Sequence, residues 1–235
     1  MARLKTGLTL GVAIAAAMML LGGCDQEPIR GRGLGTAVML LGYQGDYLEA
    51  NGRLPVAQDQ VQPMIDATNA IVTAARANAM LVFYTRDEAS PLAFVSNWSR
   101  NYATPRLWAG SQLDERADVN AGPVFAKSSK DAFCNSKLEP WLDEQNIGEL
   151  VIAGAYADRS VLTTARAALA RKYKVTVISD ALAGTSDDSR DAAIKSLKDA
   201  GADVETSQQF VAAIKPSTTI GLRGPLTGSW WLLKH

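Results

Sequence analysis

The segment LVIAGAYADRSV, residues 150–161, decides the fold that this sequence predicts. Its first six residues, 150–155, are apolar apart from one glycine, which is typical of a strand buried on both faces. The Ala-rich stretch 160–173 follows and predicts a helix. The segment therefore predicts a strand, a turn and a helix in immediate succession.

The same alternation continues on both sides of this segment. Other short apolar runs predict strands at 37–41, 80–84, 124–126, 174–179 and around Val204. Periodicity and capping residues predict helices at 61–75, 138–142, 186–200 and 210–214. Repeated strand–helix units imply an α/β fold: a three-layer sandwich with a mostly parallel, Rossmann-like sheet. Ligands bind such sheets at the carboxyl ends of the strands, here segments 42–46 and 154–160 together with Lys127.

The amino-acid composition argues against several classes of binding partner and catalytic site. Lys plus Arg and Asp plus Glu both total 24, so the formal charge is zero and no basic surplus exists for nucleic acid. The single histidine is His235, the last residue, and a His-based metal site or a Ser-His-Asp triad would depend on it. Two cysteines, Cys24 and Cys134, are too few for a disulfide framework. We therefore expect no nucleic-acid partner.

The N-terminus has the features of a bacterial lipoprotein signal. Arg3 and Lys5 precede a run of 14 mostly apolar residues, 8–21, which is too short for a comfortable transmembrane helix. The sequence LGGC at 21–24 resembles a lipobox, in which cleavage leaves Cys24 to carry acyl chains. The alternative is an ordinary signal peptide or an uncleaved anchor.

Cleavage before Cys24 would divide the chain into four parts. These are a signal peptide at 1–23, a lipidated tether at 24–35, the α/β domain at 36–214 and a C-terminal extension at 215–235. Acyl chains on Cys24 would hold the mature protein on a membrane of the cell envelope, outside the cytoplasm. Because the lipid occupies that sulfur, Cys134 would have no intrachain disulfide partner.

Five segments, in order along the chain, resemble the isochorismatase-like hydrolases, a superfamily that includes nicotinamidases and N-carbamoylsarcosine amidohydrolases. They are VMLLGYQGDY at 38–47, VFYTRD at 82–87, KSSKDAF at 127–133, VIAGAYADRSV at 151–161 and VTVISDA at 175–181. Each segment alone is weak, but their common order covers most of the predicted α/β domain. The resemblance implies the same α/β fold.

In that family an aspartate, a lysine and a cysteine act together on an amide carbonyl. The cysteine attacks, the aspartate takes its proton, and the lysine holds the charged site in place. The resemblance places the aspartate at Gly42, the lysine at Lys127 and the cysteine at Ser160. Glycine offers no acid or base, and a serine hydroxyl is a far weaker nucleophile than a thiol without an activating base. The resemblance therefore implies a degenerate catalytic set.

Different interpretations of Ser160 and Lys127 stay open at this point. In the first, the domain has lost catalysis and serves in binding or assembly. Ser160 is then an N-cap for the following helix, and Asp46, Asp158 or water meets the charge of Lys127. In the alternative, Ser160 and a neutral Lys127 form a dyad that hydrolyses small amides or esters. A third hypothesis is a sensor that keeps a ligand pocket without turnover.

Three further residues are expected in the pocket. Asp46 and Asp158 are acids near the carboxyl edge, and Tyr156 stands where the family has a small residue on a cis peptide that faces the substrate. A tyrosine there would either fill the pocket or reshape it. Metal-dependent members use histidines beyond the second strand, and residues 88–91 contain none. The prediction is a site with no metal and no other cofactor.

The C-terminal extension ends in two adjacent tryptophans, Trp230 and Trp231. One interpretation is a strap packed over the domain. The other is an aromatic patch that contacts a protein partner or a membrane, since tryptophan is favoured at both kinds of boundary. The family resemblance also implies a homo-oligomer.

Overall fold

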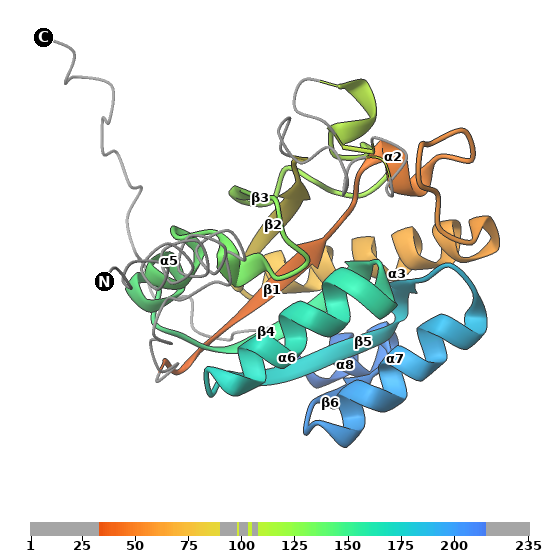
Figure 1. Cartoon of the computed structure of the whole chain (residues 1–235). Helices are drawn as coiled ribbons and strands as arrows, with labels where there is room; N and C mark the ends of the chain where they lie inside the picture. Colours follow the sequence, from red (N-terminus) through yellow and green to blue (C-terminus); the bar gives the residue numbers. More distant parts are fainter. Residues whose placement is uncertain (1–32, 90–97, 99–102, 105–107, 215–235) are drawn as a thin grey trace, which may run out of the picture.

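The computed structural model describes residues 33–89, 98, 103–104 and 108–214. Within these ranges, parallel strands form one six-stranded sheet in the order β3-β2-β1-β4-β5-β6 (Figure 1). The strands are β1 (Gly35–Leu41), β2 (Leu81–Asp87), β3 (Val124–Lys127), β4 (Ile147–Ala155), β5 (Lys174–Ala183) and β6 (Asp203–Glu205). The predicted α/β fold with a parallel sheet is confirmed.

Helices cover both faces of this sheet and complete the three layers (Figure 1). One face packs against α3 (Gln58–Ala77) and α8 (Ser207–Ala213). The other packs against α5 (Leu138–Glu144), α6 (Leu162–Ala170) and α7 (Asp187–Asp199). The short helix α2 (Gly45–Leu48) follows β1.

The central strand β1 is buried on both faces. Val38 and Leu40 contribute to the hydrophobic cluster beneath α3, whereas Met39 and Leu41 contribute to the cluster beneath α5 and α6. All four side chains are 0% exposed. Successive strand residues point to opposite faces, so two apolar layers require the uninterrupted apolar run that the sequence shows.

The helices begin where the sequence places capping residues. Ser186 caps α7 by accepting a hydrogen bond from the amide of Ser189, whose side chain in turn accepts from the amide of Ser186. Asp187 and Asp188 lie in the first turn, where a negative charge complements the helix dipole. The predicted start of this helix is confirmed.

The connection after β4 differs from the prediction of a helix that opens at residue 160. Residues Ala157–Val161 form a π-helical turn, and α6 begins only at Leu162. The peptide bond between Ala155 and Tyr156 is cis. The chain thus leaves the carboxyl end of β4 through an irregular turn, and this turn carries Ser160.

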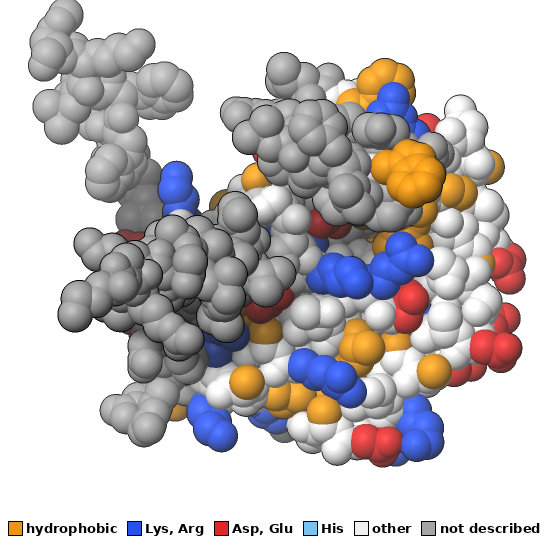
Figure 2. Space-filling model, in the orientation of Figure 1, with side chains coloured by type: hydrophobic (Ala, Val, Ile, Leu, Met, Phe, Trp, Pro, Cys, Tyr) orange, Lys and Arg blue, Asp and Glu red, His pale blue; other side chains and the backbone are white. Residues whose placement is uncertain are grey.

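The surface in Figure 2 carries Lys and Arg side chains interspersed with Asp and Glu. Among the residues that the structure describes, no helix combines the length and apolar character needed to cross a bilayer. The predicted signal peptide at 1–23 and extension at 215–235 lie outside the described residues, as does Cys24. The predicted division of the chain therefore stays a prediction.

Candidate functional site

The carboxyl ends of three strands bring Asp87, Lys127 and Ser160 together. The Nζ of Lys127 lies 2.6 Å from Oδ1 of Asp87 and 3.1 Å from Oγ of Ser160. Asp87 ends β2, Lys127 ends β3, and Ser160 follows β4. None of the three residues is more than 6% exposed. The structure thus contains a buried chain of carboxylate, ammonium and hydroxyl, which we call the Asp–Lys–Ser triad.

Lys127 uses all the donors of an ammonium group. Its third contact is the carbonyl oxygen of Ser129, at 3.0 Å. An ammonium has three N–H donors and no acceptor, so contacts to a carboxylate, a carbonyl and a hydroxyl match the protonated form. The carboxylate of Asp87 offsets the desolvation of this buried charge.

Ser160 does not cap the following helix. It lies inside the π-helical turn, and the N-cap of α6 is Val161, which makes no side-chain capping bond. Within the described residues, the only hydrogen-bond partner of Ser160 Oγ is Lys127. The N-cap hypothesis is therefore wrong, and no carboxylate or imidazole contacts this hydroxyl in the described part of the chain.

Asp87 is the member of the triad to which the sequence assigned no role. The side-chain amide of Gln44 accepts a hydrogen bond from the Asp87 amide at 2.7 Å and donates to the Asp87 carbonyl oxygen at 3.0 Å. The hydroxyl of Tyr47 donates to Asp87 Oδ2 at 3.1 Å. Hydrogen bonds therefore hold both the backbone of Asp87 and the two oxygens of its carboxylate in place.

Position 42 has no room for an acid. Gly42 has a φ of +69°, in the left-handed region, and a Cβ there would lie 2.1 Å from the carbonyl oxygen of Ala155. An L-residue is strained at this φ, and a contact of that length to backbone requires the chain to move. The backbone therefore excludes the aspartate at this position, and no substitution could restore it without rearrangement.

Asp46 holds neighbouring segments together and does not meet Lys127. Its carboxylate accepts hydrogen bonds from the amide of Thr104 at 2.6 Å and from the indole Nε1 of Trp108 at 3.3 Å. The amide of Arg53 lies 3.5 Å from the same carboxylate. The counter-ion of Lys127 is Asp87, so the expectation that Asp46, Asp158 or water meets this charge is wrong.

Tyr156 fills space in the core beside the triad. It is 3% exposed, its hydroxyl donates to the carbonyl oxygen of Leu54, and its ring packs edge-on against Tyr47 with centroids 5.1 Å apart. Tyr47 in turn bonds to Asp87. The ring that replaces a small residue therefore packs inward, against the residue that positions the acid.

Asp158 lies half-buried in the π-helical turn. Its Oδ2 lies 3.8 Å from the Nε of Arg159, and its buried Oδ1 has no hydrogen-bond partner among the described residues. The guanidinium of Arg159 stacks over the Tyr156 ring at 4.9 Å. The structure thus places Asp158 two residues from Ser160, paired loosely with an arginine.

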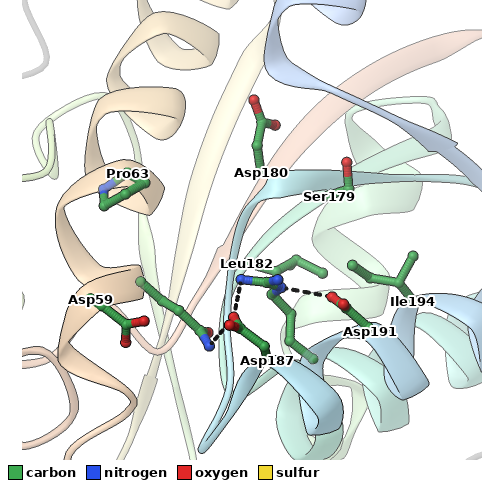
Figure 3. A pocket seen from close by; sticks show the side chains of 10 residues that line it. Asp59, Pro63, Ser179, Asp180, Leu182, Asp187, Asp191 and Ile194 are labelled. Carbon is green, nitrogen blue, oxygen red and sulfur yellow. Dashed lines mark hydrogen bonds and ion pairs between the residues drawn. The ribbon is translucent and has the colours of Figure 1, made fainter.

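A separate cavity of about 390 Å³ lies between α3, β5 and α7 (Figure 3). Four carboxylates line it: Asp59, Asp180, Asp187 and Asp191. Arg190 pairs with Asp187 at 2.9 Å and with Asp191 at 3.0 Å. Asp180 accepts hydrogen bonds from the amide and the hydroxyl of Ser207, the first residue of α8, and Asp59 lies in the first turn of α3. These partners and helix ends account for the acidic lining, which includes no member of the triad.

Two further observations concern cofactors and cysteines. In the described ranges, no three His, Cys, Asp or Glu side chains come together in a group that could hold a metal ion. Cys134 ends a short 3₁₀ turn (Ala132–Cys134), is only partly buried and is disulfide-bonded. The expectation that Cys134 lacks an intrachain partner applies only when Cys24 carries lipid, and Cys24 lies outside the described residues, so it stays a prediction.

The comparisons with known proteins agree with the fold. The model of the isochorismatase domain matches residues 36–209. Enterobactin synthase component B of Escherichia coli is 32% identical over 100 residues, which is 43% of this chain and 35% of that protein. N-carbamoylsarcosine amidase of Arthrobacter sp. is 30% identical over 130 residues, 51% of this chain and 49% of that protein. The chain thus aligns with half or less of each curated relative.

Solved structures cover more of the domain. A cysteine hydrolase from Pseudomonas syringae pv. phaseolicola has a TM-score of 0.68 at 22% identity, covering 80% of this chain and 95% of that one. An isochorismatase-like hydrolase from Alkaliphilus metalliredigens has a TM-score of 0.67 at 18% identity, covering 77% and 99%. At these identities the similarity concerns the fold alone. With the family model matched over most of the α/β domain, the chain belongs to the isochorismatase family.

Proposed function

We propose that this protein is a lipid-anchored envelope protein whose isochorismatase-like domain has lost hydrolysis and acts in binding or assembly. The observation that carries the proposal is Gly42, whose φ of +69° and contact with Ala155 exclude the aspartate of the family's catalytic set. Ser160 replaces the cysteine, so two of the three catalytic groups are absent. The hydrolase fold is then a scaffold for recognition.

The contacts around Ser160 support the loss of catalysis. A serine attacks a carbonyl only when a nearby base takes its proton. The one polar side chain in contact with Ser160 Oγ, within the described residues, is an ammonium that already pairs with Asp87. A donor at this position stabilises the hydroxyl in its resting state and does not activate it.

The alternative is an active hydrolase of small amides or esters that uses Ser160 and Lys127. The 3.1 Å distance between Lys127 Nζ and Ser160 Oγ favours it, because a neutral lysine there would be within reach of the hydroxyl proton. The relatives named above include an amidase. This alternative requires Lys127 to lose a proton while Asp87 lies 2.6 Å away.

An activity assay with a panel of small amides and esters distinguishes the inactive domain from the active hydrolase. Protein lacking residues 1–24 is assayed beside Ser160→Ala and Lys127→Ala, with Ser136→Ala as a matched control because Ser136 is exposed. We expect no turnover above background for any form. Turnover that disappears in Ser160→Ala and Lys127→Ala but persists in Ser136→Ala would establish the hydrolase and overturn the proposal.

Binding without turnover has its own measurement. The same panel is screened by thermal shift, since a ligand that binds only the folded state raises the melting temperature. A compound that stabilises the protein and is recovered unchanged supports a ligand-binding role. A partner protein reached through Trp230 and Trp231, and a homo-oligomer, stay predictions, and the two tryptophans lie outside the described residues.

A further inference from the structure

We infer that Asp87 is the residue that keeps Ser160 unreactive: it acts as the buried counter-ion that holds Lys127 as an ammonium donor. The inference rests on the proposed loss of hydrolysis and names the group that maintains it. Asp87 is a positioning residue here, because it acts on Ser160 only through Lys127.

The sheet itself aligns this pair. β2 and β3 are parallel neighbours, and Asp87 is the register partner of Lys127. Side chains of partnered residues lie on the same face, so the two charges meet wherever the strand ends are ordered. The resulting contact of 2.6 Å is the shortest of the three that Lys127 makes.

Asp87 is also held more firmly than an ordinary surface acid. Gln44 is 0% exposed and clamps the backbone amide and carbonyl of Asp87, while Tyr47 occupies the carboxylate oxygen that Lys127 leaves free. With these contacts the carboxylate has no other orientation to adopt without breaking a buried hydrogen bond. The counter-ion is therefore permanently presented to Lys127.

Other charged groups near the triad do not replace Asp87. Asp131, at the start of the turn after β3, interacts electrostatically with Lys127, but its carboxylate accepts from the amide of Phe133. On the π-helical turn, Asp158 and Arg159 offset one another. Removal of the Asp87 charge would leave the desolvated Lys127 ammonium without its carboxylate partner at 2.6 Å, and burial then favours the neutral amine.

A neutral Lys127 would be a general base 3.1 Å from the Ser160 hydroxyl. A fluorophosphonate probe reports this change directly. The oxygen of Ser160 forms the bond to phosphorus, fluoride leaves with its electron pair, and the hydroxyl proton passes to Nζ of Lys127. We expect Asp87→Asn to raise the rate of Ser160 labelling by roughly 100-fold, within the usual range for a general base, with a rate that increases with pH.

Matched variants separate charge from packing. Asp87→Glu keeps a carboxylate opposite Lys127, so it should label far more slowly than Asp87→Asn. Glu139→Gln disrupts a different buried ion pair, with Arg171 at 3.3 Å, and should leave labelling at the wild-type rate. The double variant Asp87→Asn with Ser160→Ala should lose the label, which assigns it to this hydroxyl.

A second readout covers the case in which the probe does not reach the site. Nitrogen-15 NMR of lysine side chains distinguishes an ammonium from a neutral amine. A folded Asp87→Asn protein in which the Lys127 side chain stays an ammonium under the conditions of the labelling assay overturns the inference. Rapid labelling or turnover in the wild type would instead refute the proposed loss of hydrolysis, so the two failures are distinguishable.

Discussion

A Cβ at Gly42 would lie 2.1 Å from the carbonyl oxygen of Ala155. This contact joins the ends of two neighbouring strands, because β1 pairs with β4 up to Leu41 and Gly154. The close approach belongs to the backbone, and no side-chain rotation relieves it. Loss of the acid at position 42 is therefore built into the path of the chain.

Any side chain at position 42 should destabilise the domain. Gly201 is the matched control, since its φ is +98° but no heavy atom lies within 4 Å of a Cβ there. Gly201→Ala tests the backbone strain alone, about 1–2 kcal/mol. Gly42→Ala adds a steric clash and should lower the free energy of unfolding by about 1–3 kcal/mol more. Urea unfolding of both variants measures the difference.

The same clash predicts that the family's catalytic set cannot be rebuilt by substitution. Gly42→Asp combined with Ser160→Cys restores both residue types but not the space for the carboxylate. We expect this double variant to be less stable than Ser160→Cys alone and to hydrolyse no amide in the panel. A folded double variant with amidase activity would show that the turn rearranges to accept the acid.

Asp46 should contribute more to stability than an acid with exposed partners. Asp46→Ala removes the carboxylate that accepts hydrogen bonds from the amide of Thr104 and the indole of Trp108, and hydrogen bonds to charged groups contribute about 1.5–3 kcal/mol each. Asp66→Ala, on the exposed side of α3, should change the free energy of unfolding by less than about 0.5 kcal/mol. Equal effects in the two variants, measured by denaturant unfolding, would contradict the structural role of Asp46.

The sequence predicts the fold well because the signal is local. The apolar run of β1 and the capping serine of α7 each report on their own segment, and both are confirmed. The proximity of Lys127 and Ser160 can also be predicted from the sequence, because both lie at or just after the carboxyl ends of strands in a parallel sheet. What joins them is a common edge, which topology alone provides.

The role of Asp87 depends on information that no local pattern contains. Its contact with Lys127 requires β3 to pair with β2 in one particular register. The two residues are 40 positions apart, and the sequence around each one does not specify that register. The interpretation of Ser160 as an N-cap is wrong because the π-helical turn delays the start of α6 to Leu162. The sequence does hold one signal for Asp87, because this acid stands at the end of a predicted strand. Testing each possible register between neighbouring strands for an acid opposite Lys127 would find the pair.

Asp131 predicts a pH-dependent stability. Burial raises the pKa of this carboxyl, against the opposing effects of its hydrogen bond from Phe133 and of Arg171 and Lys127. A raised folded-state pKa disfavours the native state once the group ionises, so this cost is absent below the ordinary pKa of about 3.9 and develops as pH rises through the folded value. Asp131→Asn, which keeps an acceptor for Phe133, should therefore stabilise the domain at neutral pH. Denaturant unfolding from acidic to neutral pH checks that the gain vanishes in acid.

The two cysteines allow a decisive test of the lipid anchor. A sulfur in a thioether to lipid cannot also form a disulfide, and Cys24 is the only other cysteine available to Cys134. If Cys24 is lipidated as proposed, Cys134 in the mature membrane protein should react with iodoacetamide without prior reduction. The disulfide of Cys134 in this structure would then belong only to chains that carry no lipid.

Mass spectrometry of protein extracted from bacterial membranes distinguishes these states. We expect an acylated N-terminal peptide beginning at Cys24 and an alkylated Cys134 in the same preparation. Cys24→Ser should move the protein from the membrane fraction to the soluble fraction, because acyl chains provide the attachment, whereas Cys134→Ser should leave it in the membrane fraction. A disulfide-linked peptide pair joining Cys24 to Cys134 in the mature protein would refute the lipid anchor, since the sulfur of Cys24 would then carry no lipid.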